Sequence, residues 1–207
     1  MVKSWLHLPQ RASAEMVYAQ PWRGGCGIIP LADLADILVI AQAFRMLSCK
    51  DLDMAEIAKS SLEQVVQKRT FHRPTPQEII SEFLSGSLDG PFARDKQGDP
   101  NIWTRVRITS RRLSKKLRVQ WKWDKVENSL AITIRDTGDR TVTVPLSARS
   151  QIIWRLRKAT QNRYLEMLTA KRDQGKVSEV TLRNRESNLC LRDGKYIRFA
   201  EWRFIHR

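Results

Sequence analysis

Residues 117–146, LRVQWKWDKVENSLAITIRDTGDRTVTVPL, decide the fold class of this chain. They contain three short runs in which apolar and polar residues alternate, and this period of two is typical of strands that bury one face. Trp121 and Trp123 share one face of the first run, and Ile132 and Ile134 share one face of the second. The turn sequence DTGD precedes the third run, RTVTVPL. The region therefore predicts a three-stranded antiparallel meander.

A basic helix is predicted just before this sheet, starting at Asp99-Pro100. No acidic residue occurs between Asp99 and Asp124. Basic side chains at helical spacing can contact phosphates, so we expect this helix to bind RNA. The hypothesis is sharpest for the last four of its candidate binding residues, which are Arg105, Arg107, Arg111, Arg112, Lys115 and Lys116.

A second long helix is predicted after the sheet, from a cap at Ser147 to about Arg172, with Gly175 as its stop. Trp154 on this helix and Trp103 on the basic helix lie beside apolar residues, so we expect both in the core, as we do Trp121 and Trp123. The candidates for phosphate contact are Arg155, Lys158 and Arg163. The side chains expected to point inward are Ile152, Ile153, Leu156, Ala159, Met167 and Leu168.

The last part of the sequence predicts a hairpin turn at Asp193-Gly194 and the beginning of a further helix in FAEWRFIHR. Trp202 lies close to Arg198 and Arg203 in this stretch, and an aromatic ring among arginines can stack on an unpaired base. These three residues are therefore further candidates for nucleic-acid binding.

Three short helices are predicted in the first half of the chain. The first follows Pro30, the second is capped by Asp51 or Asp53, and the third begins with a Thr75 cap and stops near Gly86. Residues 86–100 contain several Gly and Asp-Gly breaks and are predicted to be a linker or surface loop. The apolar residues that define the first two helices are Leu31, Leu34, Ile37, Leu38, Ala41, Phe44, Met54, Ile57, Ala58, Leu62, Val65 and Val66.

The positive charge is concentrated in the second half of the chain. Residues 1–100 hold 11 Lys and Arg against 12 Asp and Glu, whereas residues 101–207 hold 26 against 10, so the net charge of +15 arises beyond residue 100. This asymmetry makes polyanions the first partners to consider. We expect an α+β chain with an N-terminal helical bundle at 1–70, a helix and linker at 71–100, and a basic α+β nucleic-acid-binding domain at 101–207.

The sequence carries no recognisable catalytic or metal-binding signature. The sequence contains no phosphate-binding loop, no HExxH and no Asp-Asp pair. The scattered cysteines, Cys26, Cys49 and Cys190, form no zinc or disulfide pattern and favour a reducing, intracellular setting. No apolar run is long enough to span a membrane. We therefore expect no catalytic site, no cofactor and no metal in this chain itself.

The opening stretch, WLHLPQRASAEMVYAQPWRGGCGI at residues 5–28, resembles the segment that follows the reverse-transcriptase core in non-LTR retrotransposon proteins. That family has a W-x-x-LP element, an aromatic residue and a basic G-G-x-G-I turn before its thumb helices, usually with Leu where Cys26 stands. The end of the chain, YIRFAEWRFIHR, resembles the approach to the zinc knuckle in elements with a restriction-like endonuclease. The matching residues of the opening stretch are Trp5, Leu8, Pro9, Tyr18, Arg23, Gly24, Gly25, Gly27 and Ile28.

The resemblance implies that the chain is the thumb and linker portion of a nuclear LINE-type polyprotein. The thumb at residues 1–70 would grip primer–template DNA, with Arg23, Gly24 and Gly25 at the nucleic acid, and residues 71–207 would hold element RNA during target-primed reverse transcription. The Gly pair would let backbone approach a strand closely, although a plain tight turn accounts for it equally well. Its partners would be RNA, DNA and the rest of the polyprotein, where a polymerase core, a zinc knuckle and an endonuclease would hold Mg²⁺ and Zn²⁺.

Two alternatives remain open at this point. One is a free-standing, intracellular basic RNA-binding protein whose ends match the retrotransposon segments by chance. The other is a small metal-independent RNA-processing nuclease that uses His7, His72 or His206 together with Arg and Lys.

Overall fold

The computed structural model describes residues 4, 6, 8, 10–71, 73, 75–93, 100–183 and 186. The chain divides into two compact units: Leu31–Ala159, which we call the sheet unit, and Met1–Pro30 together with Thr160–Arg207, which we call the terminal unit. The bounds of these units differ from the predicted divisions at residues 70 and 100. The predicted hairpin at 193–194 and the helix predicted after it lie outside the described residues.

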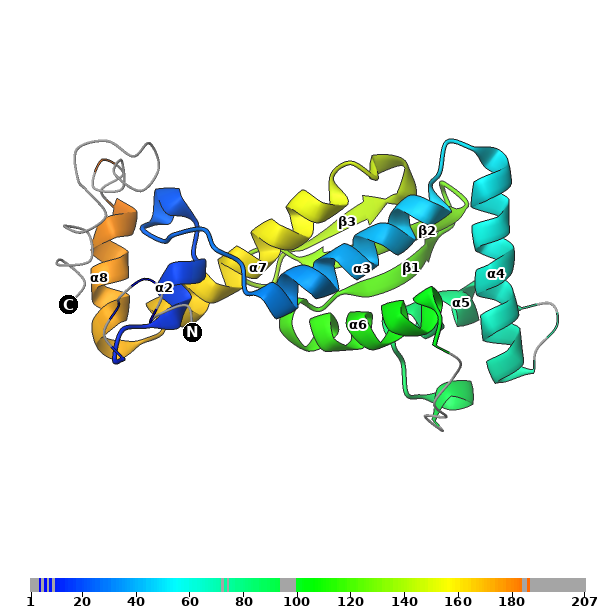
Figure 1. Cartoon of the computed structure of the whole chain (residues 1–207), viewed down its shortest axis with the longest axis horizontal. Coiled ribbons are helices and arrows are strands. Elements are labelled where there is room, and N and C mark those ends of the chain that lie inside the picture. The colour runs from blue at the N-terminus through cyan, green and yellow to red at the C-terminus, as the bar shows by residue number, and fades with distance from the viewer. Residues whose placement is uncertain are drawn as a thin grey trace. The chain divides into compact units, whose positions relative to one another are not determined.

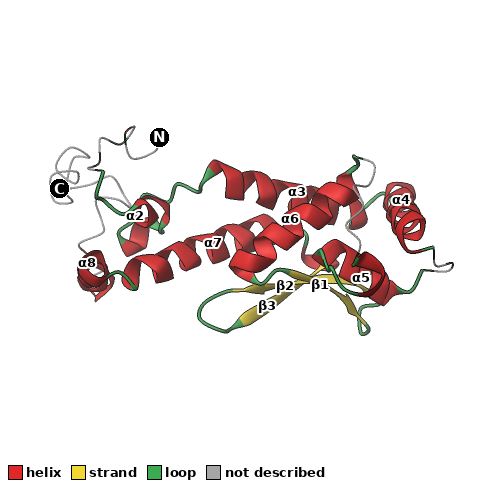
Figure 2. Cartoon of the chain, turned by 90° about the horizontal axis from the view of Figure 1, so that it is seen from below, coloured by secondary structure: helices red, strands yellow, loops and turns green. Residues whose placement is uncertain are grey.

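The sheet unit combines helices with one antiparallel sheet in the order β1-β2-β3, which confirms the predicted α+β class and the meander (Figures 1 and 2). Trp121 lies opposite Ile132, and Ile132 lies opposite Val144, so large side chains share one sheet face. The elements are α3 (Leu31–Leu47), α4 (Leu52–Thr70), α5 (Gln77–Ser85), η2 (Gly90–Phe92), α6 (Ile102–Leu117), β1 (Gln120–Asp124), β2 (Ser129–Arg135), β3 (Thr141–Pro145), η3 (Leu146–Ala148) and the first part of α7 (Ile152–Thr169).

One hydrophobic core joins the early helices to the sheet. Helices α3, α6 and the first part of α7 lie on the same side of the sheet (Figure 2), and the Phe44 ring of α3 lies 6.0 Å from that of Trp121. The predicted burial of Trp103 and Trp121 is confirmed, and each indole Nε1 donates a hydrogen bond to a serine hydroxyl, Ser61 at 3.1 Å and Ser110 at 3.0 Å. The predicted N-terminal bundle and the predicted basic domain therefore share a core.

Strand β1 lies at the edge of the sheet next to α5. The Ser85 hydroxyl accepts a hydrogen bond from the Trp121 N–H at 2.8 Å and donates one to the Trp121 carbonyl at 3.1 Å. This hydroxyl satisfies the backbone groups of Trp121 at an edge to which the described residues add no further strand. Gly86 ends α5 as predicted, with φ +80°, and an added Cβ would lie 2.6 Å from the Cβ of Arg111 on α6.

Several helix starts differ from the prediction by a few residues. The Asp51 cap of α4 is confirmed, because its carboxylate accepts from the N–H groups of Asp53 and Met54. Helix α6 is capped by Asn101 rather than begun at Asp99-Pro100, since the Asn101 side chain accepts from the Thr104 N–H at 2.8 Å. Helix α5 begins after Pro76 without a side-chain cap, so the predicted Thr75 cap is wrong.

The predicted helix 147–172 is shorter in the structure, where α7 covers Ile152–Thr169 and lies between η3 and a further helix, α8 (Arg172–Arg183). Ser147 belongs to η3 and hydrogen-bonds the Glu127 carboxylate, and α7 begins only at Ile152. Gly175 does not stop the helix but lies inside α8. An added Cβ at Gly175 would lie 2.4 Å from the Thr169 carbonyl oxygen, so the glycine permits the tight passage from α7 to α8.

The terminal unit packs the opening stretch against the later part of α7. Helix α2 (Ala14–Tyr18) and η1 (Pro21–Arg23) carry the contact. The Gln20 amide donates to the Asn162 side chain at 3.2 Å, and the Tyr18 ring lies 4.7 Å from the Tyr164 ring. This packing gives the opening stretch a structural role within its own unit.

Candidate nucleic-acid interface

Arg107, a predicted phosphate contact, lies inside the sheet unit. It is 3% exposed, and its guanidinium lies 5.3 Å from the Phe83 ring centre and 5.0 Å from that of Phe92. Its Nη2 donates to the Ser87 carbonyl at 2.8 Å. A cation held over two rings and a carbonyl is part of the packing. The prediction that Arg107 contacts nucleic acid is therefore corrected.

Arg112 and Lys116, one helical turn apart on α6, form ion pairs with carboxylates of α3. Arg112 pairs with Asp36, and Lys116 pairs with Asp33, whose side chain is 2% exposed. Because a buried carboxylate without a cation is strongly unfavourable, these pairs fix α6 against α3. We call Arg107, Arg112 and Lys116 the committed cations.

The other predicted cations of α6 differ in exposure. Arg105 and Lys115 are exposed, and Arg111 is half-buried. Arg105 and Lys115 are ten residues apart, which places them about 15 Å apart along the helix. The six predicted residues of α6 therefore do not form one phosphate-binding face.

Cations from three elements gather at the turn between β2 and β3. The turn carboxylate Asp139 pairs with Arg118, the C-cap of α6, at 3.1 Å, and Asp136 lies 3.7 Å from Lys158 of α7. Arg135 donates to the Gly138 carbonyl within the turn, and Arg140 is exposed at its end. We call this region the hairpin end and group with it Lys115, three residues before Arg118 on α6, and Arg155, three residues before Lys158 on α7. Its cations are then Lys115, Arg118, Arg135, Arg140, Arg155 and Lys158.

Three cations at the hairpin end are exposed and contribute little to the stability of the fold. The side chains of Arg118 and Asp139 are 62% and 86% exposed, and such a surface pair contributes only about 0–1 kcal/mol. Lys115 and Arg140 are exposed, and neither pairs with a carboxylate of the part of the chain that the structure describes. We call Lys115, Arg118 and Arg140 the open cations.

Trp154 lies next to this group and corrects a further prediction. It is 54% exposed rather than buried, because Ile152, Leu156 and Ala159 form the buried stripe of α7. Arg155 and Lys158 lie 4.9 Å and 5.3 Å from its ring centre. Met167, also expected to point inward, is exposed as well.

Sequence reasoning missed Arg118, Arg135 and Arg140 as site residues. They lie on a helix cap, a strand end and a turn, so no single periodic pattern contains them. The strand pairing that brings 120 opposite 133 places these segments together, and the meander prediction was the only signal for it.

The Gly pair of the opening stretch is used within the terminal unit. Gly24 has φ +83°, and an added Cβ at Gly25 would lie 2.2 Å from the Ala19 carbonyl oxygen. The N–H groups of Gly25 and Gly27 donate to the carbonyls of Gln20 and Ala19. Of the two explanations open for the glycines, this geometry favours the tight turn.

The remaining predicted residues have separate positions. Arg23 ends η1, and Arg163 lies 5.7 Å from the Tyr164 ring, both in the terminal unit. Arg198, Trp202 and Arg203 lie outside the described residues, as do His7, His72 and His206 of the nuclease alternative.

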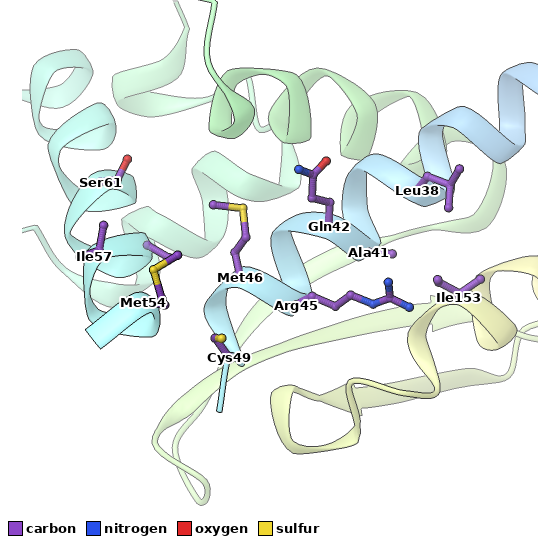
Figure 3. A pocket seen from close by; sticks show the side chains of 11 residues that line it. Leu38, Ala41, Gln42, Arg45, Met46, Cys49, Met54, Ile57, Ser61 and Ile153 are labelled. Atoms are coloured by element: carbon purple, nitrogen blue, oxygen red, sulfur yellow. The ribbon is translucent and has the colours of Figure 1, made fainter. Parts of the chain in front are cut away.

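An apolar groove of about 540 Å³ opens between α3, α4 and the start of α7 (Figure 3). It exposes Leu38, Met54 and Ile57, which the helical periodicity predicted to be on buried faces. Arg45 extends across the groove (Figure 3), and no acidic residue lines it. The groove has the chemistry of a hydrophobic contact surface and contains no pairing of nucleophile and base.

The described part of the chain holds no cluster of metal ligands. No three His, Cys, Asp or Glu side chains gather there as metal ligands. Burial raises the pKa of the Cys26 thiol to about 11, so Cys26 is a packing residue. Within the same residues, no helix is both long and apolar enough to cross a membrane.

A family model matches most of the chain. Residues 38–207 match the family model described as the T26G10.4 domain, which covers most of the sheet unit and continues to the last residue. Neither a curated protein nor a solved structure matches the chain. Because the family model spans well over half of the sequence, the chain belongs to the T26G10.4 domain family.

Proposed function

We propose that this chain binds nucleic acid through the hairpin end of its sheet unit. The observation that carries the proposal is the convergence of cations from α6, the β2–β3 turn and α7 around two exposed or half-exposed carboxylates. Such a group has excess positive charge on exposed side chains that can reach phosphates. The committed cations contribute to folding, and the open cations contribute to binding.

We further propose that this binding serves the thumb and linker of a non-LTR retrotransposon reverse transcriptase. The resemblance of the opening stretch supports the thumb, and the helices α3 and α4 follow it in the expected order. In this setting the chain holds RNA and primer–template DNA in the nucleus for a polymerase core and an endonuclease elsewhere in the polyprotein. By the same resemblance, those parts supply the Mg²⁺ and Zn²⁺ chemistry.

Binding is tested by removing the open cations together. We expect the variant Lys115→Gln/Arg118→Gln/Arg140→Gln to bind oligouridylate more weakly in fluorescence anisotropy. The negative slope of log K against log salt should become shallower by about 2 to 3, because each lost phosphate contact removes about 0.7–0.9. The matched control is Lys50→Gln/Lys59→Gln/Lys68→Gln, which removes the same charge from exposed residues of the near-neutral half. Equal losses in both variants would show that only net charge matters and would contradict the proposal.

The retrotransposon setting has its own test. We expect the natural reading frame to carry a Tyr/Phe-Ala-Asp-Asp motif upstream of this chain and a zinc knuckle with a nuclease downstream. A frame without either would leave a free-standing RNA-binding protein, which uses the same hairpin end.

A further inference from the structure

Trp154 is the large aromatic side chain at the hairpin end, and the fold does not bury it. Its neighbours along α7 show why: Ile152 and Leu156 are fully buried, and a position two residues after Ile152 lies about 200° around the helix. More than half of the indole is therefore in contact with water, at 54% exposure. Trp103 and Trp121, by contrast, contribute to the core.

Two cations of α7 lie over this ring. Arg155 Cζ lies 4.9 Å and Lys158 Nζ 5.3 Å from the ring centre. Lys158 is also 3.7 Å from Asp136, which links the ring to the β2–β3 turn where Arg118 and Arg140 lie. An exposed aromatic ring with cations beside it is the arrangement by which proteins hold unpaired nucleotides, stacking on the base and neutralising the phosphates.

We infer that Trp154 is a stacking platform for an unpaired base, with Arg155 and Lys158 placed for the adjoining phosphates. This inference rests on the proposed function and names its ligand as a single strand. In a duplex each base face is covered by its neighbours, so a ring on a helix surface reaches a base only where the strand is unpaired. The open cations contact the backbone of the same strand as it continues along the turn.

The inference is tested with ligands that differ from one another in base, sugar or pairing. The probes are an oligothymidylate, an abasic oligonucleotide of the same length and backbone, an oligouridylate, and a duplex of the same length. We expect the full chain to bind oligothymidylate about 5- to 150-fold more tightly than the abasic strand, since stacking is lost with the base. Trp154→Leu removes this preference, whereas Trp154→Phe retains part of it.

The salt slope separates stacking from phosphate contact. Trp154→Leu leaves the slope of log K against log salt unchanged, while Arg155→Gln/Lys158→Gln makes this negative slope shallower. Since Trp154 is exposed, circular dichroism should show the same fold for both tryptophan variants. Equal affinities for oligothymidylate and oligouridylate mean that the platform accepts both sugars. A higher affinity for one of the two identifies that strand as the ligand.

Two results would overturn the inference in distinguishable ways. If the wild-type chain binds thymidylate and abasic strands equally, or if the duplex binds as tightly as the single strand, the platform is wrong while nucleic-acid binding stands. If the wild-type chain binds none of the four probes even at low salt, the proposed function fails as well.

Discussion

Lysine and arginine side chains of α6 have two different roles. Toward α3, Arg112 and Lys116 pair with Asp36 and Asp33, and the second of these carboxylates is buried. At the C-terminal end of α6, Lys115 is exposed, and among the described residues Arg118 pairs with the exposed Asp139 of the β2–β3 turn. The difference lies in the carboxylate that each cation meets, because a buried partner requires its cation and an exposed one does not.

This comparison shows that a basic run in a sequence is not a measure of a binding surface. Part of the charge of α6 neutralises acids that lie far away in the sequence, and Arg107 is held by aromatic rings. Only the remaining cations are available to a ligand. The predictions below separate the two groups, beginning with the largest effect.

Lys116→Met should destabilise the sheet unit by about 3 kcal/mol, because the buried Asp33 carboxylate loses its cation. The matched change Lys115→Met alters an exposed neighbour and should shift the free energy of unfolding by less than about 0.5 kcal/mol. Urea denaturation of both variants measures the difference. Equal stabilities would remove the distinction between the committed and the open cations.

Arg107→Met should cost about 2 kcal/mol, since it removes the bond to the Ser87 carbonyl and the cation between Phe83 and Phe92. At temperatures where the variant is folded, its affinity for oligouridylate should equal that of the wild type. Arg105→Met, at an exposed position, should leave stability unchanged. A loss of affinity in folded Arg107→Met would return this residue to the binding surface.

The smallest expected effect on stability comes from the ion pair between Lys171 and Glu15 in the terminal unit. Burial of the Glu15 carboxylate acts to raise its pKa, but hydrogen bonds from Lys171, at 2.7 Å, and from Ser13 outweigh burial and lower the pKa to about 2. Because the folded pKa lies below the ordinary 4.5, the pair stabilises the fold above that pH, and this contribution is lost as pH falls from 4.5 through 2.

NMR titration of the Glu15 carboxyl carbon measures this pKa directly. Lys171→Met should raise the Glu15 pKa from about 2 toward the ordinary 4.5, since burial is then less opposed. An unchanged pKa in that variant would mean that Lys171 does not lower the pKa of Glu15.

The sequence predicted the sheet well, because strand alternation and turn residues are local signals. It also predicted the Asp51 cap and the burial of Trp103 and Trp121. It could not predict which cations are committed, because Asp33 and Asp36 meet α6 only in the tertiary structure. The single core that the early helices share with the later strands could not be predicted either, because its contacts form only in the tertiary structure.

Other errors arose where a local signal had a second meaning. Gly175 was taken for a helix stop, but its missing side chain serves a close approach to Thr169. Trp154 was assigned to the core on hydrophobicity, although its position off the Ile152–Leu156–Ala159 stripe already indicated exposure. Counting helical angles would have corrected the second error from the sequence.

The most direct test of the central claim is arginine footprinting with phenylglyoxal and mass spectrometry, with and without oligouridylate. If the open cations bind and the committed cations fold, RNA should protect Arg118 and Arg140. Arg107 should be unreactive in both states, and the partly exposed Arg112 should react equally in both. Protection of Arg112 with no change at Arg118 and Arg140 would contradict the account.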